Sequence, residues 1–310
     1  MKAQREAWGE ALTAVAVQDQ RIIVLDGDLA TSTRADIFAE AHPDRFFQIG
    51  IAEQNLVGMA FGMSTLGYRP WVSSLTVFLT HRALDPLRML VAQTHAPVRI
   101  ASSYAGLLTG ATGKTHQDVE DLAIMRAMPG MTVLAPADAG EVEAMVGWAA
   151  DHPGPVYLRL ARDPVAEVVP AGLPFVLGEV RILREGTDAV LVSTGVQSSR
   201  VVDAAELLDA QGVHATVVHV PCLKPIDSAA LLHAVSGRGP IFTVEEHSVL
   251  GGLGGLVSEL LTSSGYNQGL VRIGLADGWA ESAPNEFLLE KYGLSAARVA
   301  ARVASVVAPV

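Results

Sequence analysis

One carboxylate, Glu53, stands where a strand pattern gives way to a helix pattern, and a side chain in such a place can do acid–base chemistry. The run FFQIGI at residues 46–51 is rich in β-forming residues, and Gly50 permits a tight turn. From Ala52 the apolar residues recur at helical spacing, which puts Glu53 in the first turn of a helix. In an α/β protein, ligands bind at the carboxyl ends of the strands, and a buried carboxyl group there can hold and donate a proton near neutral pH.

The residues around Glu53 leave two interpretations open. A glutamate in a first helical turn can simply complement the helix dipole. Gly58, Ala60 and Gly62 follow on the same helix pattern, however, and such small residues predict close packing that buries the start of the helix. Burial would favour the catalytic interpretation of Glu53.

Two glycine-rich segments look like phosphate-binding motifs but have the wrong spacing. GATGKTH, residues 110–116, ends like a P-loop, yet that motif needs a glycine five positions before Gly113, where this chain has Leu108. GGLGG, residues 251–255, follows a strand pattern and precedes a helix pattern, but it does not match G-x-G-x-x-G. We therefore expect a tight turn with close helix packing at the second segment.

Composition limits the classes of partner and compartment. A net charge of −11 and a pI near 5.2 argue against a nucleic-acid partner, which needs a basic face. Cys222 is the single cysteine, which excludes an internal disulfide and a cysteine-ligated metal cluster and predicts a cytoplasmic location. The histidines form no His-x-x-x-His pair, so no metal ligands are expected. No apolar run approaches the roughly 18 residues of a membrane span, so we expect a soluble chain.

Strand and helix patterns alternate along the chain in two series. The first has strands at 21–25, 46–51 and 69–73 and in PVRIAS, MTVLA and PVYLRLA, with helices at 2–18, 32–41 and 80–94 and one that Asp138 caps. Three prolines in DPVAEVVPAGLP, residues 163–174, interrupt the alternation. A second series follows, with strands in DAVLVSTG, HATVVHV and PIFTVEEH and at 270–273 and a last helix from residue 295. The alternation predicts an α/β fold of two three-layer αβα domains with mostly parallel sheets.

Four segments stand in a specific order: DGDLATST, IGIAEQNLVGMAFGMSTLGYRPWVSS, GKTHQDVEDLAIMRAMPGMTVLAPADAGE and EEHSVLGGLG. In sequence and order the chain resembles the C-terminal half of transketolase and its thiamine-diphosphate-dependent relatives, over nearly its whole length. The resemblance implies a pyrimidine-binding domain for thiamine diphosphate at residues 1–165, a linker at 166–177 and a transketolase C-terminal domain at 178–310.

The resemblance also implies a cofactor-binding end of the site. In this family the glutamate that matches Glu53 bonds to the aminopyrimidine ring nitrogen of thiamine diphosphate, and its proton activates the cofactor. Phe78 matches the aromatic residue that stacks on the aminopyrimidine, and Asp28 matches a carboxylate near the cofactor. Leu75 and His81 stand where transketolases carry further aromatic residues, so we expect an altered pocket there.

At the substrate end, the resemblance implies a catalytic, substrate-facing role for His116. Arg5, Ser32 and Arg162 match positions that hold the phosphate group of a sugar phosphate, which suits guanidinium groups. As isolated residues, these arginines would be interpreted as solvated surface.

Three departures from the family pattern fall at this same end. Thr112 replaces the acidic residue that contacts a substrate hydroxyl, and Tyr104 replaces a phosphate-contacting histidine. Lys114 could offer a new anion contact. The resemblance therefore implies an intact cofactor end and a rebuilt substrate end.

The family's diphosphate and magnesium motif, G-D-G followed by a distant asparagine, is absent from this chain, in which Asp26, Gly27 and Asp28 have the reverse order. We therefore expect an N-terminal transketolase subunit to supply the diphosphate and Mg²⁺ site, in an α2β2 heterotetramer.

Three functions remain open. The first is the C-terminal subunit of a two-component transketolase, which moves a two-carbon ketol unit between sugar phosphates. The second is a component that decarboxylates a 2-oxo acid, as in deoxyxylulose phosphate synthases or oxo-acid dehydrogenase beta subunits. The third is a non-catalytic assembly subunit. Retention of Arg5, Ser32, His116 and Arg162 favours the first, and intact Glu53 and Phe78 weigh against the third.

Overall fold

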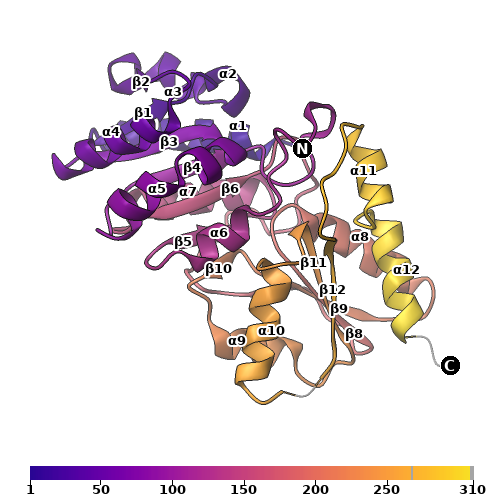
Figure 1. Cartoon of the computed structure of the whole chain (residues 1–310). Helices are drawn as coiled ribbons and strands as arrows, with labels where there is room; N and C mark the ends of the chain where they lie inside the picture. The colour runs from indigo at the N-terminus through magenta and orange to yellow at the C-terminus, as the bar shows by residue number, and fades with distance from the viewer. Residues whose placement is uncertain (267, 308–310) are drawn as a thin grey trace.

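The chain folds around two β-sheets (Figure 1). The computed structural model describes residues 1–266 and 268–307. The first sheet has seven strands in the order β10-β5-β6-β4-β3-β1-β2, and the second has five in the order β12-β11-β8-β9-β7. Most neighbouring strands in both sheets are parallel, and helices cover both faces of each. The predicted α/β class with two three-layer αβα units is confirmed.

Alternating side chains divide the core of the first sheet into two layers. Its strands include β1 (Ile22–Asp26), β2 (Phe46–Gln48), β3 (Arg69–Leu75), β4 (Arg99–Ser103), β5 (Thr132–Leu134) and β6 (Val156–Leu160). Ile22 and Val24 face a layer with α1 (Gln4–Gln18), α3 (Asp36–Ala41) and α7 (Ala139–Asp151). Ile23 and Leu25 face the layer of α4 (Glu53–Thr65) and α6 (Asp121–Ala127). Since successive strand residues point to opposite faces, an unbroken apolar run suits a strand buried on both sides.

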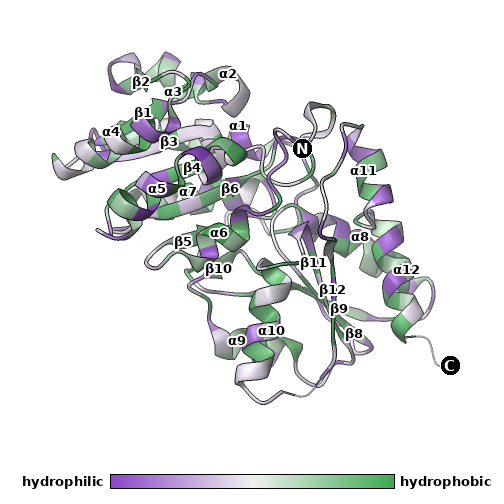
Figure 2. Ribbon diagram, viewed as in Figure 1, coloured by the Kyte–Doolittle hydropathy of each residue, from purple (hydrophilic) through white to green (hydrophobic). Residues whose placement is uncertain are grey.

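The second sheet repeats this arrangement with β7 (Arg181–Arg184), β8 (Ala189–Ser193), β9 (Ala215–His219), β11 (Ile241–Ser248) and β12 (Leu270–Leu275). One face packs on α8 (Gln197–Asp209) and α12 (Ala296–Val307), and the other packs on α9 (Ser228–Val235) and α10 (Leu253–Ser263). A short helix, α11 (Asn285–Lys291), leads to α12 (Figure 1). Hydrophobic residues recur on the strands and helices of both units (Figure 2). Within residues 1–266 and 268–307, no helix is long and apolar enough to cross a membrane.

Two predicted helices have a different form in the structure. The helix expected at 80–94 is a series of short segments, η2 (Phe78–Arg82), α5 (Leu84–Pro86) and η3 (Leu87–Ala92), in which η2 and η3 have wide π-type turns. Pro86 lacks the N–H group that a regular helix needs there. The helix expected at 32–41 is split into α2 (Ala30–Thr33) and α3, because Arg34 takes a left-handed φ of 68°. The predicted cap of α7 is confirmed, since Asp138 accepts a hydrogen bond from the Glu141 N–H.

One strand crosses between the two halves of the chain and was not predicted. β10 (Cys222–Lys224) belongs to the C-terminal half in sequence but pairs antiparallel with β5 at the edge of the first sheet. Its three residues are too few to show an alternating pattern. The first sheet is therefore completed by the C-terminal half.

The carboxyl ends of the parallel strands lie along one edge of the first sheet. Asp26 is in register with Gln48, and Leu75 is in register with Ser103, which pairs in turn with Leu160. Each of these strand ends is followed within a few residues by a predicted site residue. In strand order β1, β2, β3, β4 and β6, these are Asp28, Glu53, Phe78, Tyr104 and Arg162.

Candidate active site

Glu53 begins α4 after a turn at Gly50, whose φ of 85° lies in the left-handed region that glycine favours. Glu53 is buried, with 3% of the residue exposed, and its Oε1 atom accepts a hydrogen bond from Nη1 of Arg82 at 3.1 Å. The expected burial is present, and of the three small residues predicted to pack closely, Ala60 is buried in the core. A Cβ atom added to Gly58 or Gly62 would meet no atom within 4 Å, so these glycines do not pack against the chain itself.

The aromatic ring of Phe78 lies next to this ion pair. The guanidinium carbon of Arg82 is 3.9 Å from the centre of the Phe78 ring, and the His116 ring meets Phe78 edge-on at 5.4 Å. Leu75 is buried at the end of β3, just before this segment. Glu53, Arg82, Phe78 and His116 thus form a continuous series of contacts. Sequence reasoning missed Arg82, although its position four residues after Phe78 is the spacing of neighbours on a helix.

Asp28 lies at the same sheet edge but is not a helix cap. It is exposed, has a left-handed φ of 67°, and donates its backbone N–H to Oε1 of Gln48 at 2.8 Å. The carboxylate that organises this turn is the buried Asp26, which accepts hydrogen bonds from the Leu29 N–H and from Nε2 of Gln48. Burial raises the pKa of Asp26. Asp28 therefore does not cap α2, whose N-cap is Leu29.

Four predicted substrate residues form a second cluster. Nη1 of Arg5 donates to the Ser32 carbonyl oxygen at 2.5 Å and lies 3.3 Å from the Tyr104 hydroxyl, while Nε of Arg5 donates to the Arg162 carbonyl oxygen at 3.0 Å. The guanidinium carbons of Arg5 and Arg162 each lie 5.4 Å from the centre of the Tyr104 ring. Gln4 fixes the start of α1 here, because its amide bonds to Pro136 O and Ala161 N. Ser32 contributes its carbonyl group rather than its hydroxyl group.

Thr112 and Lys114 are not joined to this cluster. Both are exposed in the loop around η4 (Gly110–Thr112), where the Thr112 hydroxyl donates to the Thr109 carbonyl group. Within residues 1–266 and 268–307, neither forms a hydrogen bond or ion pair with Arg5, Tyr104 or Arg162.

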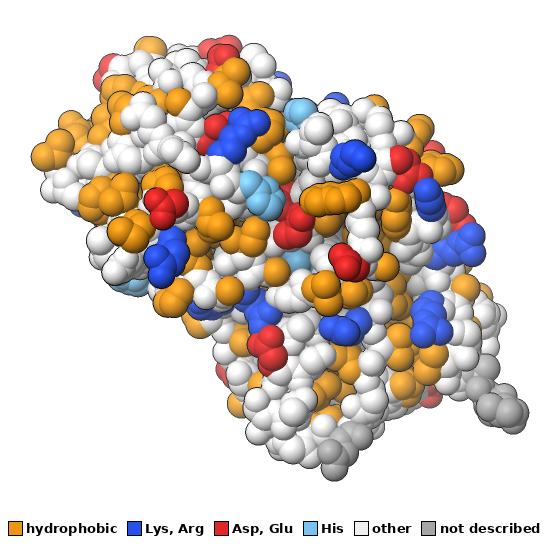
Figure 3. Space-filling model, in the orientation of Figure 1, with side chains coloured by type: hydrophobic (Ala, Val, Ile, Leu, Met, Phe, Trp, Pro, Cys, Tyr) orange, Lys and Arg blue, Asp and Glu red, His pale blue; other side chains and the backbone are white. Residues whose placement is uncertain are grey.

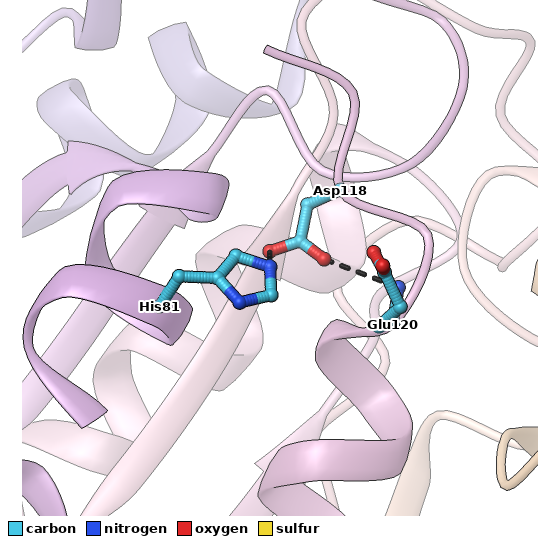
Figure 4. Close-up of side chains that lie close together, drawn as sticks. All are labelled: His81, Asp118 and Glu120. Carbon is cyan, nitrogen blue, oxygen red and sulfur yellow. Dashed lines mark hydrogen bonds and ion pairs between the residues drawn. The ribbon is translucent and has the colours of Figure 1, made fainter. Parts of the chain in front are cut away.

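His81 faces a buried carboxylate from the loop after β4 (Figure 4). Its Nε2 atom lies 4.0 Å from Oδ2 of Asp118, and Oδ1 of Asp118 accepts the Glu120 N–H at 3.1 Å. The Thr80 hydroxyl also donates to Oδ2. Burial and the nearby Asp121 carboxylate raise the pKa of Asp118 to about 7. Asp118 was not among the predicted site residues, since its position becomes meaningful only when the loop packs beside η2.

The loop that carries Tyr104 and His116 is held by both halves of the chain. The Gly106 N–H donates to the Asp118 carbonyl group and closes the loop. Oε1 of Glu246, a buried residue on β11, accepts the N–H groups of residues 107 and 108 at 2.8 and 3.0 Å. Arg159 on β6 donates to the Glu246 carbonyl group and to Asp121. The second unit therefore fixes the position of a loop in the first.

The glycine-rich GGLGG segment forms the predicted turn into a helix. A carboxylate accepts hydrogen bonds from the N–H groups at the start of that helix. Glu245 accepts the N–H groups of Leu253 and Gly254 at 2.6 and 2.8 Å. Burial raises the pKa of Glu245 to about 7. Rejection of a dinucleotide fingerprint agrees with this geometry, because the amide groups at the start of α10 already have an acceptor.

Comparisons with known proteins identify the family. Residues 1–166 match the model of the transketolase pyrimidine-binding domain, and residues 178–299 match that of the transketolase C-terminal domain. The chain is 37% identical to a provisionally named transketolase C-terminal section of Methanocaldococcus jannaschii, over 97% of this chain and 95% of that one. It is 35% identical to a 6-deoxy-6-sulfo-D-fructose transketolase subunit of Clostridium sp., over 95% and 91% of the two chains.

A solved structure gives the same result. A split-gene transketolase, described as an inactive beta4 tetramer, superposes with a TM-score of 0.91 and 43% identity over 98% of both chains. The chain therefore belongs to the transketolase family, and it corresponds to the C-terminal section of the family's split members.

Proposed function

We propose that this chain is the C-terminal subunit of a two-component, thiamine-diphosphate-dependent transketolase that moves a two-carbon ketol unit between anionic sugars. In this proposal, residues 1–165 bind the pyrimidine end of the cofactor, and residues 178–310 form the C-terminal domain after a linker at 166–177. The observation that carries the proposal is the contact series Glu53, Arg82, Phe78 and His116 at the carboxyl edge of the first sheet.

The residues at this edge fit an aminopyrimidine. Glu53 offers a buried carboxyl group to a ring nitrogen, and Phe78 offers a planar apolar face for stacking. Thiamine diphosphate, when bound, supplies the carbanion chemistry. Glu53 holds the proton at the pyrimidine nitrogen, where its burial excludes water, and Phe78 orients the ring. His116, in contact with Phe78, is placed to exchange a proton with a substrate hydroxyl group.

The cluster around Tyr104 fits the anionic group of the sugar. Two guanidinium groups flank the ring, and Nε of Arg162 is buried with no hydrogen-bond acceptor within the described residues. A buried donor without an acceptor is costly, and a phosphate or sulfonate oxygen would satisfy it. The relative named for a sulfonated ketose supports a wider substrate class than sugar phosphates. Tyr104, Thr112 and Lys114 are the proposed determinants of specificity.

The proposed assembly has two interfaces. An N-terminal partner subunit supplies the diphosphate and Mg²⁺ site, and a second copy of this chain completes an α2β2 particle. Exposed apolar side chains near α4 support self-association; these are Ile51, Met59, Leu66 and Tyr68. On the face drawn in Figure 3, hydrophobic side chains gather over the region of α4 and β2.

Glu53→Gln tests the function directly. We expect the variant, assembled with the N-terminal partner, to lose at least about 100-fold in the rate of ketol transfer, because proton transfer contributes about 10² to 10⁴ in rate. The control is Gln54→Ala, an exposed neighbour on the same turn. Full activity of Glu53→Gln would reject the catalytic proposal and leave an assembly subunit. A requirement for pyruvate in the wild-type complex would instead indicate the decarboxylating alternative.

A further inference from the structure

We propose that His81, Asp118 and Glu120 form a binding site for a divalent first-row metal ion such as Zn²⁺ or Mn²⁺. One nitrogen of His81 and one carboxylate oxygen from each of the two acids lie within 4.8 Å of one another. The site is empty in this structure. It is distinct from the Mg²⁺ site proposed for the partner subunit, and it does not depend on the proposed transketolase activity.

The three side chains converge from two different segments (Figure 4). His81 comes from the wide-turn segment η2, while Asp118 and Glu120 come from the loop that enters α6. The Gly106 N–H donates to the Asp118 carbonyl group and closes that loop, and Glu246 holds its start. The backbone that carries Asp118 and Glu120 is therefore held in place. The third member, His81, is 44% exposed at its side chain.

The donor set indicates the class of ion. One imidazole nitrogen with two carboxylate oxygens suits Zn²⁺, Mn²⁺ or Fe²⁺, whereas Mg²⁺ and Ca²⁺ prefer oxygen donors alone. Metal–ligand bonds of about 2.0–2.2 Å bring neighbouring ligand atoms to roughly 3.3 Å from one another. His81 Nε2 lies 4.0 Å from Oδ2 of Asp118, so a shift of under about 1 Å in the exposed imidazole would complete this pair.

The electrostatic surroundings of Asp118 also favour a bound cation. Asp118 is fully buried, and within the described residues its carboxylate has no lysine or arginine partner. A buried carboxylate is stabilised by a bound cation. Asp121, three residues later, has this stabilisation from Arg159, and Asp118 does not.

Calorimetric titration of ZnCl₂ or MnCl₂ into the full, tag-free, chelator-treated chain tests the site. We expect one equivalent to bind, and His81→Ala and Glu120→Gln each to weaken that binding at least tenfold. Both substitutions fall at side chains that are not fully buried, so the fold should survive; circular dichroism checks this. The matched control is His214→Ala, which removes an exposed histidine 3.0 Å from Asp209; among the described residues this pair belongs to no three-ligand group.

Each outcome of these titrations either supports the metal site or overturns it. Loss of binding in both variants with retention in His214→Ala supports the site, and a Co²⁺ absorption spectrum that disappears in the same two variants reports the ligands directly. The proposal is overturned by no binding of Zn²⁺, Mn²⁺ or Co²⁺ to the wild-type chain, or by binding that survives His81→Ala. It is also overturned if only one variant weakens binding, because a three-ligand site needs both. None of these readouts depends on activity.

Discussion

Arg82 contacts both side chains that are proposed to bind the cofactor, Glu53 and Phe78. Its guanidinium group bonds to Glu53 and covers one face of Phe78, with the Arg82 side chain 48% exposed. An aminopyrimidine that bonds to the carboxylate and stacks on that face must displace it. A half-exposed ion pair is worth about 0–1 kcal/mol and an exposed cation–π contact about 0.5–1 kcal/mol, so the displacement costs on the order of 1 kcal/mol.

We therefore expect Arg82→Met to bind thiamine diphosphate about fivefold more tightly in the assembled complex, as measured by titration of cofactor fluorescence quenching or by calorimetry. Arg88→Met, at an exposed arginine in the same segment, should leave the affinity unchanged. Binding that is more than tenfold weaker in Arg82→Met would show that Arg82 is a cofactor ligand rather than a competitor.

Arg162 should determine how well the anionic group of the substrate binds. Its Nε atom forms no hydrogen bond in the described chain, since the Asp163 carboxylate lies 4.0 Å away, and a charge-assisted hydrogen bond is worth about 1.5–3 kcal/mol. Arg162→Ala should raise KM for a phosphorylated ketose donor about 10- to 100-fold while leaving kcat and the KM of a neutral ketose nearly unchanged. Arg298→Ala, at an exposed ion pair on α12, is the control. An equal effect on the neutral donor would contradict the assignment.

At the scale of secondary-structure elements, α4 presents an unpacked glycine face. A Cβ at Gly58 or Gly62 would meet nothing within 4 Å, although both lie on a helix whose opposite side is in the core. Glycine in a helix costs about 0.5–1 kcal/mol relative to alanine, and close approach of a second helix in the proposed contact would account for glycine at these two positions. The face therefore belongs to the proposed contact with a second copy.

Gly62→Leu should disrupt self-association and give a smaller particle by light scattering coupled to size exclusion. Gly147→Leu is the matched control, because Gly147 is also exposed on a helix, α7, with no atom within 4 Å of an added Cβ. Both variants should keep the folded monomer. An unchanged particle in Gly62→Leu would remove α4 from the interface.

The elements also show how far sequence reasoning could reach. Apolar runs between helix patterns were enough to predict parallel sheets, and a strand end placed Glu53 at the sheet edge, whereas Phe78 and Tyr104 were expected only from the family resemblance. The wide turns of η2 were not predictable, because their apolar spacing resembles a regular helix. β10 was not predictable either, since three residues carry no period and its pairing depends on tertiary contact. The roles of Asp118 and Glu246 likewise depend on loops packing across the molecule.

At the scale of the whole molecule, buried carboxyl groups make stability depend on pH. Burial raises the pKa of Glu245 to about 7, above its usual value of 4.5, although the N–H groups of residues 253 and 254 and the charges of Arg159 and Arg272 act in the opposite direction. Between about pH 4.5 and pH 7, the Glu245 carboxyl group is therefore protonated in the folded state and ionised in the unfolded chain. Stability from this group is largest at low pH and is lost as the pH rises through 7.

Glu245→Gln removes this contribution and keeps His247, which lies 3.7 Å away, has a pKa lowered by burial and acts on stability with the opposite sign. The stability of the wild type relative to the variant should fall by about 2 kcal/mol between pH 5 and pH 8, as measured by urea unfolding of both proteins. A pH-independent difference would contradict the raised pKa of Glu245.

The contacts between Glu246 and the loop at residues 106–118 have a consequence for binding. Residues 106–118 would be costly to order, at about 1–2 kcal/mol per residue, if they were free in solution. Glu246 holds the start of this segment, and the bond from the Gly106 N–H to the Asp118 carbonyl group joins its two ends, before any ligand arrives. Entropy that a loose loop would lose when substrate binds has already been lost when the chain folds. In the proposed function, the C-terminal unit thereby contributes to substrate affinity as a source of preorganisation.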